Sequence, residues 1–217
     1  MSEQEQAFEA MAQSNTFLLL KQAGIHLGVW VLAFCLFAAS DSWTQLTGWQ
    51  IASALNVLTG FIAGFVTVNL LHEWFHYFGA RAVSGSYTVN ARPSMFIYDW
   101  KFEHNNLRQF YIMSLAGTVG GVIAVLLVFN AVDANSAGRA ALVGGAVASF
   151  AFGSIIEWPV LARTRHSKDP LAELSKLNPP RLGRAAAGSA IAGLATWALL
   201  TCCLLYTSDA ADELRSV

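Results

Sequence analysis

One segment of the sequence has residue types and spacing that could bind a metal and hydrolyse a bond: His72-Glu73-Trp74-Phe75-His76. On a helix, two residues separated by four positions lie one turn apart on the same face. Both imidazoles can then reach one Zn²⁺, with Glu73 beside them. Zinc polarises a carbonyl and lowers the pKa of its bound water to about 7, and a carboxylate can then move the proton. The pattern predicts His72 and His76 as zinc ligands and Glu73 as the catalytic residue.

The motif lies inside an apolar run, about residues 51–79, which is long enough to cross a bilayer as a helix. An ionisable side chain costs roughly 2.5–3.5 kcal/mol at the centre of an inserted helix. Three such groups within five residues therefore favour a metal site over a chance arrangement. The alternative interpretation is a polar cluster near the membrane surface that binds no metal.

A catalytic zinc has three protein ligands and one open position, so a third ligand is needed. The candidates are Glu157, Asp169, His104 and His166. Glu157 lies in an apolar run six residues before Arg163, and His76 lies five residues before Arg81, so the two side chains are expected at similar depth. We therefore favour Glu157, with Asp169 as the alternative third ligand; Asp169 also fits the role of a plain helix cap.

The composition indicates a membrane protein. Of 217 residues, 55% are hydrophobic and only 12% are charged, whereas soluble domains carry about 25% charged residues. So few charges cannot cover the surface of a water-soluble globule of this size, which makes the lipid bilayer the expected partner of much of the surface. The formal net charge of −1 and the lack of a basic tract give no indication of nucleic-acid binding.

Apolar segments of about the length of a membrane span occur at residues 22–39, 51–79, 109–132, 140–162 and 185–206. Helices are expected because lipid offers no hydrogen-bond partner to an open sheet edge. The fold class predicted is therefore an all-α polytopic membrane protein with about five transmembrane helices. The membrane-embedded domain is placed at 22–206, after an N-terminal segment at 1–21.

The last residues, 207–217, are treated as a separate tail. They include SDAADELRSV, which resembles the translated linker sequence sometimes found at the ends of environmental gene fragments. We assign this tail no function and leave open whether it is native.

Lysine and arginine are unevenly distributed among the connections between the spans. They are concentrated in residues 81–108 and 163–184, whereas the two opposite connections carry only Arg139. Cytoplasmic loops carry an excess of these residues. We therefore expect the N-terminus and the motif side of the protein to be cytoplasmic.

The two basic connections also contain predicted secondary structure. Alternating residues in SYTVNA and SMFIYDW, within 81–108, predict short strands in a cytoplasmic loop, with a hairpin as the pairing considered. The segment KDPLAELSKLN, residues 168–178, predicts a short interfacial helix with Asp169 as its N-cap and Pro170 at its first position. The small residues of SLAGTVGG, residues 114–121, predict close packing of the third span against the motif helix.

Residues from about 60 to 180 resemble the site-2 protease family of intramembrane zinc metalloproteases. The resemblance is carried by HEWFHYFGARAVSG, the strand-containing loop, SLAGTVGG, and an apolar span ending in EWP. It implies Zn²⁺ on His72 and His76, acid and base catalysis by Glu73, and hydrolysis of peptide bonds in a membrane-anchored protein substrate, as in regulated intramembrane proteolysis.

The chain departs from the family pattern at several positions. Phe75 stands where glycine is usual before the second histidine, Thr118 replaces the proline of an Ala-Gly-Pro element, and no Leu-Asp-Gly occurs. These departures keep open a second hypothesis, in which the chain is a non-catalytic metal-binding membrane scaffold or an inactive relative of the proteases.

Overall fold

The computed structural model describes residues 3–92 and 94–215. Within these ranges the fold is all-α, with five helices long and apolar enough to cross a membrane and one small two-stranded sheet. The predicted fold class of a polytopic membrane protein is therefore confirmed. The elements in chain order are α1 (Glu3–Thr47), α2 (Gln50–Ala82), β1 (Tyr87–Val89), β2 (Tyr98–Trp100), the 3₁₀ helix η1 (Phe102–His104), α3 (Leu107–Ala131), α4 (Ala137–Ser167), α5 (Pro170–Leu174) and α6 (Pro179–Arg215).

Each predicted span corresponds to one long helix, but the helices extend further than the apolar runs. Their candidate membrane segments are Asn15–Thr47, Gln50–Ala82, Leu107–Ala131, Ala137–Ser167 and Pro179–Cys203. In addition, α1 runs through most of the predicted N-terminal segment 1–21, and α6 continues into the predicted tail 207–217 as far as Arg215. An apolar run marks only the part of a helix expected in lipid, whereas the helix itself continues until a cap or turn ends it.

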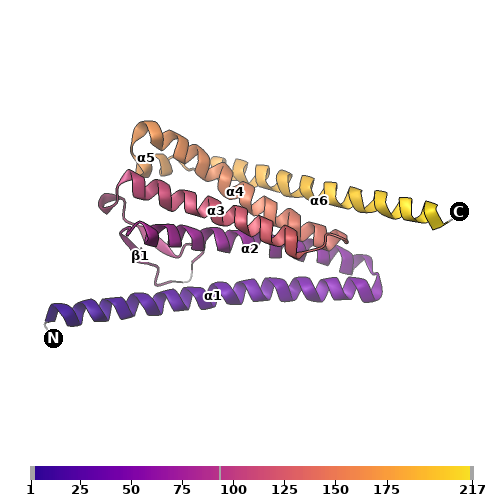
Figure 1. Ribbon diagram of the computed structural model, residues 1–217, viewed down its shortest axis with the longest axis horizontal. Coiled ribbons are helices and arrows are strands. Elements are labelled where there is room, and N and C mark those ends of the chain that lie inside the picture. Colours follow the sequence, from indigo (N-terminus) through magenta and orange to yellow (C-terminus); the bar gives the residue numbers. More distant parts are fainter. Residues whose placement is uncertain (1–2, 93, 216–217) are drawn as a thin grey trace.

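Helix α2, which carries the motif, lies at the centre of the bundle (Figure 1) and packs against α1, α3 and α4, while α6 packs on α4. Glycines allow α2 and α4 to approach closely. A Cβ atom at Gly64 would overlap the carbonyl oxygen of Leu142, and one at Gly145 would overlap the carbonyl oxygen of Phe61. Such small residues are the usual means of close helix packing in lipid. The approach brings the motif helix against the helix that carries Glu157.

The connection between α2 and α3 forms the predicted hairpin, with β1 and β2 paired antiparallel. It begins at a turn that ends α2, where Ser84 has a positive φ of 50° and the N–H of Gly85 donates to the carbonyl of Ala80 at 2.8 Å. A side chain at Gly85 would overlap the Trp100 ring. The turn therefore holds β2 close to the end of the motif helix, and Figure 1 shows the hairpin and α5 at the same end of the bundle.

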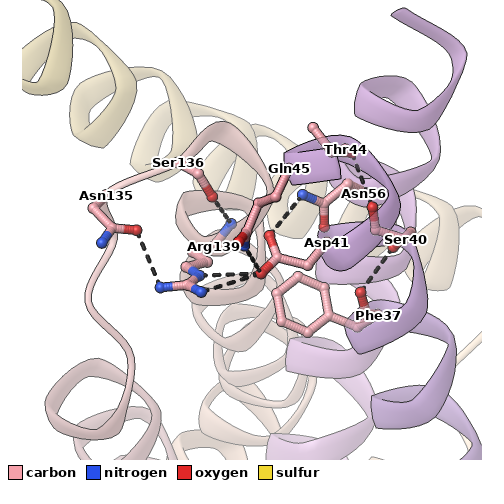
Figure 2. Close-up of polar contacts among 9 residues, drawn as sticks. All are labelled: Phe37, Ser40, Asp41, Thr44, Gln45, Asn56, Asn135, Ser136 and Arg139. Atoms are coloured by element: carbon pink, nitrogen blue, oxygen red, sulfur yellow. Dashed lines mark hydrogen bonds and ion pairs between the residues drawn. The ribbon is translucent and has the colours of Figure 1, made fainter. Parts of the chain in front are cut away.

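A partly buried polar network lies near the opposite end of α2 (Figure 2). Oδ2 of Asp41, on α1, accepts hydrogen bonds from Nε and Nη2 of Arg139 on α4 at 3.3 and 3.2 Å. Oδ1 of Asp41 accepts one from the amide of Asn56 on α2 at 3.0 Å. At 1.5 Å per residue, Asn56 lies about 24 Å along α2 from His72. The network therefore ties three helices together far from the motif.

We expect Asp41→Ala to lower the free energy of unfolding by about 2–3 kcal/mol, because it removes the acceptor of Nε and Nη2 of Arg139 and of the Asn56 amide. The loss should be smaller than the roughly 3–5 kcal/mol of a fully buried pair, since the Arg139 side chain is 34% exposed. Thermal unfolding in detergent measures the effect. Asp133→Ala, in the exposed α3–α4 connection, is the control. Equal unfolding temperatures for the two variants would contradict the assignment of a stabilising network.

Candidate metal centre

The structure brings the two histidines of the motif together with Glu157. The imidazole centroids of His72 and His76 are 4.5 Å apart, and their Nε2 atoms are 2.9 Å apart. Oε1 of Glu157, on α4, lies 2.7 Å from Nε2 of His72 and 3.1 Å from Nε2 of His76. Three possible ligand atoms from two helices thus converge, and the group could hold a metal ion.

The hydrogen bonds of His76 determine which of its nitrogens can bind a metal. Its Nδ1 lies 2.9 Å from the backbone carbonyl oxygen of Met113 on α3. Since a carbonyl only accepts, Nδ1 carries the proton, and in a neutral ring Nε2 presents its lone pair to Glu157 and His72. A ring N–H bound to a carbonyl is the usual way in which a protein orients a metal-binding histidine.

The carboxylate of Glu157 also fits a cation. Its Oε1 faces the lone pair on Nε2 of His76. Both atoms are hydrogen-bond acceptors, so a proton or a cation between them would stabilise the pair. Its Oε2 is buried and has no hydrogen-bond partner in the part of the chain that the structure describes. A buried carboxylate oxygen without a partner is costly. Two imidazoles and one carboxylate are also the ligand set of several catalytic zinc sites, so the residues present fit such an ion.

Gly117 on α3 provides space that the His76 ring occupies, whereas added Cβ atoms at Gly121 and Gly153 would only make ordinary contact with His72. A Cβ atom at Gly117 would overlap the ring of His76. A Cβ atom at Gly121 would lie 3.5 Å from Nδ1 of His72, and a Cβ atom at Gly153 would lie 3.4 Å from Cε1 of the same ring. The predicted close packing of residues 114–121 against the motif helix is therefore confirmed.

Gly117→Ala is expected to weaken zinc binding by at least about 100-fold. The new methyl group would occupy part of the space of the His76 ring, so the ring must turn away from the Met113 carbonyl, and loss of such an orienting partner alone costs roughly 10–100-fold. Competition with a chromogenic chelator measures the affinity. Gly183→Ala, with nothing within 4 Å of its added Cβ, is the control. Parent-like affinity in Gly117→Ala would contradict the proposed crowding.

A cavity of about 240 Å³ opens beside these residues. Glu73, His76 and Glu157 line one part of it. The remaining lining residues come from the hairpin region, η1, α3, α4 and α5: Phe96, Tyr98, Trp100, Phe102, Phe110, Met113, Ser114, Ile156, Val160, Leu161 and Leu174. Burial raises the pKa of Tyr98, so its phenol is protonated at neutral pH. An apolar cavity with a few converging polar groups is the usual form of a binding site.

Other candidate ligands lie apart from the group. The carboxylate of Asp169 caps α5 and accepts a hydrogen bond from the N–H of Ala172 at 3.0 Å, with Pro170 at the start of the helix, as predicted for an interfacial helix. His104 lies in η1 and His166 in the last turn of α4. Within the described ranges, none of these three ligand candidates joins the metal-binding group.

The motif also makes a contact that sequence reasoning did not identify. The indole N–H of Trp74 donates to Nδ1 of His26 at 3.2 Å. Nδ1 of His26 is therefore an acceptor, so in the neutral ring Nε2 carries the proton and donates to the carbonyl of Ser94 at 2.9 Å. His26 thus links α1, the motif helix and the hairpin connection, which is a structural role.

Comparison with known proteins gives no relative for this chain. No protein-family model matches it, and neither a curated protein nor a solved structure is significantly similar to it. The geometry of the site is therefore the basis for a functional proposal.

Proposed function

We propose that this protein is an intramembrane zinc metalloendopeptidase of the site-2 protease type, with His72, His76 and Glu157 as zinc ligands and Glu73 as general base and acid. One observation carries the proposal. Ligand atoms of the two histidines and of Glu157 converge within apolar helices, beside a cavity that Glu73 also lines. The ligand set and the neighbouring carboxylate are those of a hydrolytic zinc site.

The residues of the chain would share the chemistry in the following way. A bound zinc ion would supply Lewis acidity, which polarises the scissile carbonyl and acidifies water. Glu73 takes a proton from the attacking water and delivers it to the nitrogen of the leaving amine as the C–N bond breaks. Met113 holds the His76 ring with its Nε2 lone pair toward the ligand group. The aromatic and aliphatic cavity walls surround this reaction with largely apolar side chains.

The substrate we propose is a segment of a membrane-anchored protein. The cavity is lined by residues of the hairpin region and of α5 together with the motif helix, so it lies toward one end of the spans. The Lys- and Arg-rich connections, α2–α3 and α4–α6, lie at this same end. Lysine and arginine are enriched in cytoplasmic loops, so the active site would face the cytoplasm. Cleavage there would release cytoplasmic segments of the substrate, as in regulated intramembrane proteolysis.

Metal removal tests the proposal. The protein is reconstituted in vesicles with a set of single-span membrane peptides, and the products are identified by mass spectrometry. Cleavage is expected to stop after treatment with a zinc chelator and to return with about one equivalent of Zn²⁺. Cleavage that continues in metal-free protein would contradict the proposal. Zinc uptake without cleavage of any peptide would favour the non-catalytic metal-binding scaffold instead.

A further inference from the structure

A second cavity, of about 190 Å³, lies between α4 and the start of α6. Its walls combine guanidinium and aliphatic side chains: Arg163, Arg181 and Arg184, with Ile155, Ile156 and Leu177 among the apolar residues. We refer to it as the arginine cavity. It is distinct from the cavity beside the metal centre, with which it shares Ile156.

The arginine cavity has two arginines, Arg181 and Arg184, that no carboxylate of the described residues pairs with. Nη1 of Arg181 is also buried and lacks a hydrogen-bond partner within residues 3–92 and 94–215. Buried donors of a charged group nearly always have an acceptor. The cavity therefore has the character of an incomplete anion site.

The third arginine is partly paired. Nε of Arg163 donates to Oε2 of Glu173 at 2.9 Å. Glu173 is already shared, because its Oε1 accepts from Lys176 at 2.7 Å. Hydrogen bonding from Lys176 and Arg163 lowers the pKa of Glu173, so this carboxylate is ionised at neutral pH. Both of its oxygens are used in this way, and within the described part of the chain Glu173 forms no ion pair with Arg181 or Arg184.

The position of the arginine cavity indicates what its ligand would be. It lies beside the basic last turns of α4, near Arg165 and His166, where α6 begins. Basic pockets between membrane helices at this level suit anionic lipid headgroups. The planar donor fork of arginine matches phosphate oxygens, and the aliphatic walls match the apolar part of a lipid better than they match a free ion.

We propose that the arginine cavity binds the phosphate headgroup of an anionic phospholipid, with Arg181 and Arg184 as its main contacts and Arg163 at its edge. Ile156, which lines both cavities, directly precedes Glu157. A lipid bound there packs against the segment of α4 that carries this carboxylate. The binding claim does not depend on the proposed protease activity.

Lipid binding to the purified full chain tests the inference. Native mass spectrometry and thermal unfolding are compared with phosphatidylglycerol and with phosphatidylcholine as probes. The parent should retain phosphatidylglycerol and unfold at a higher temperature with it than with phosphatidylcholine. Arg181→Gln combined with Arg184→Gln should weaken phosphatidylglycerol binding by roughly 30-fold. Arg184→Gln alone should weaken phosphatidylglycerol binding by roughly fivefold. Because the Arg184 side chain is exposed, this single variant should fold even if the double variant does not.

The matched control is Arg165→Gln combined with Lys168→Gln, which removes two charges at the end of α4, at exposed positions that do not line the cavity. It should keep parent-like binding. Equal losses in the two double variants would reduce the effect to general surface charge and overturn the proposal. Full competition by inorganic phosphate at the same concentration would also overturn it, in favour of a site for free phosphate.

Discussion

Glu73→Gln is expected to abolish peptide cleavage while the protein still folds and binds zinc. The carboxylate lines the same cavity as His76 and Glu157 and is not one of the converging ligand atoms. Glutamine has nearly the same shape but cannot accept the proton of the attacking water. General acid and base catalysis contributes roughly 10²–10⁴-fold, so we expect the cleavage rate to fall by at least about 100-fold.

The measurement is the cleavage rate in vesicles, with the zinc content of the same preparation. Glu103→Gln is the matched control, since Glu103 is exposed in η1 and does not line the cavity. It should cleave at the parent rate. Parent-like cleavage by Glu73→Gln would rule out the catalytic role, and loss of zinc from this variant would show that the residue supports the metal instead.

Glu157→Gln is expected to weaken zinc binding by at least about 100-fold. Oε1 of Glu157 is the carboxylate oxygen nearest to both histidine nitrogens. A neutral amide is a much poorer zinc ligand than a carboxylate, and even partners that only orient a ligand contribute roughly 10–100-fold. Equilibrium dialysis against a competing chelator measures the difference.

Asp169→Asn is the control that separates the two carboxylates considered from the sequence. Asparagine caps a helix about as well as aspartate, so α5 should stay intact and the zinc affinity should remain within about threefold of the parent. The reverse pattern, with zinc lost in Asp169→Asn and kept in Glu157→Gln, would assign the third ligand to Asp169.

The membrane architecture could be predicted because it follows from local properties of the sequence. Apolar runs of sufficient length mark the spans, and alternation in the loop marks the strands. Helix periodicity places His72 and His76 on one face of α2. Depth relative to the flanking arginines pointed to Glu157, and the structure brings this residue to the two histidines.

Other features depend on contacts between distant segments and leave no such local signal. A backbone acceptor such as the carbonyl of Met113 is independent of residue type, so its bond to His76 could not be predicted. The pairing of Asp41 with Arg139 across two helices depends on how the helices rotate against each other. The small residues around Gly117 predicted close packing, but not that the His76 ring is the group they accommodate.

The most direct test of a metal centre in this protein is its zinc content. The parent chain and His72→Ala are purified, dialysed against a small excess of Zn²⁺ and analysed for bound metal. We expect about one zinc per parent chain and loss of most of it in His72→Ala, because one of the converging ligand atoms is then missing. A parent chain that takes up no zinc, or a variant that holds as much as the parent, would contradict the account.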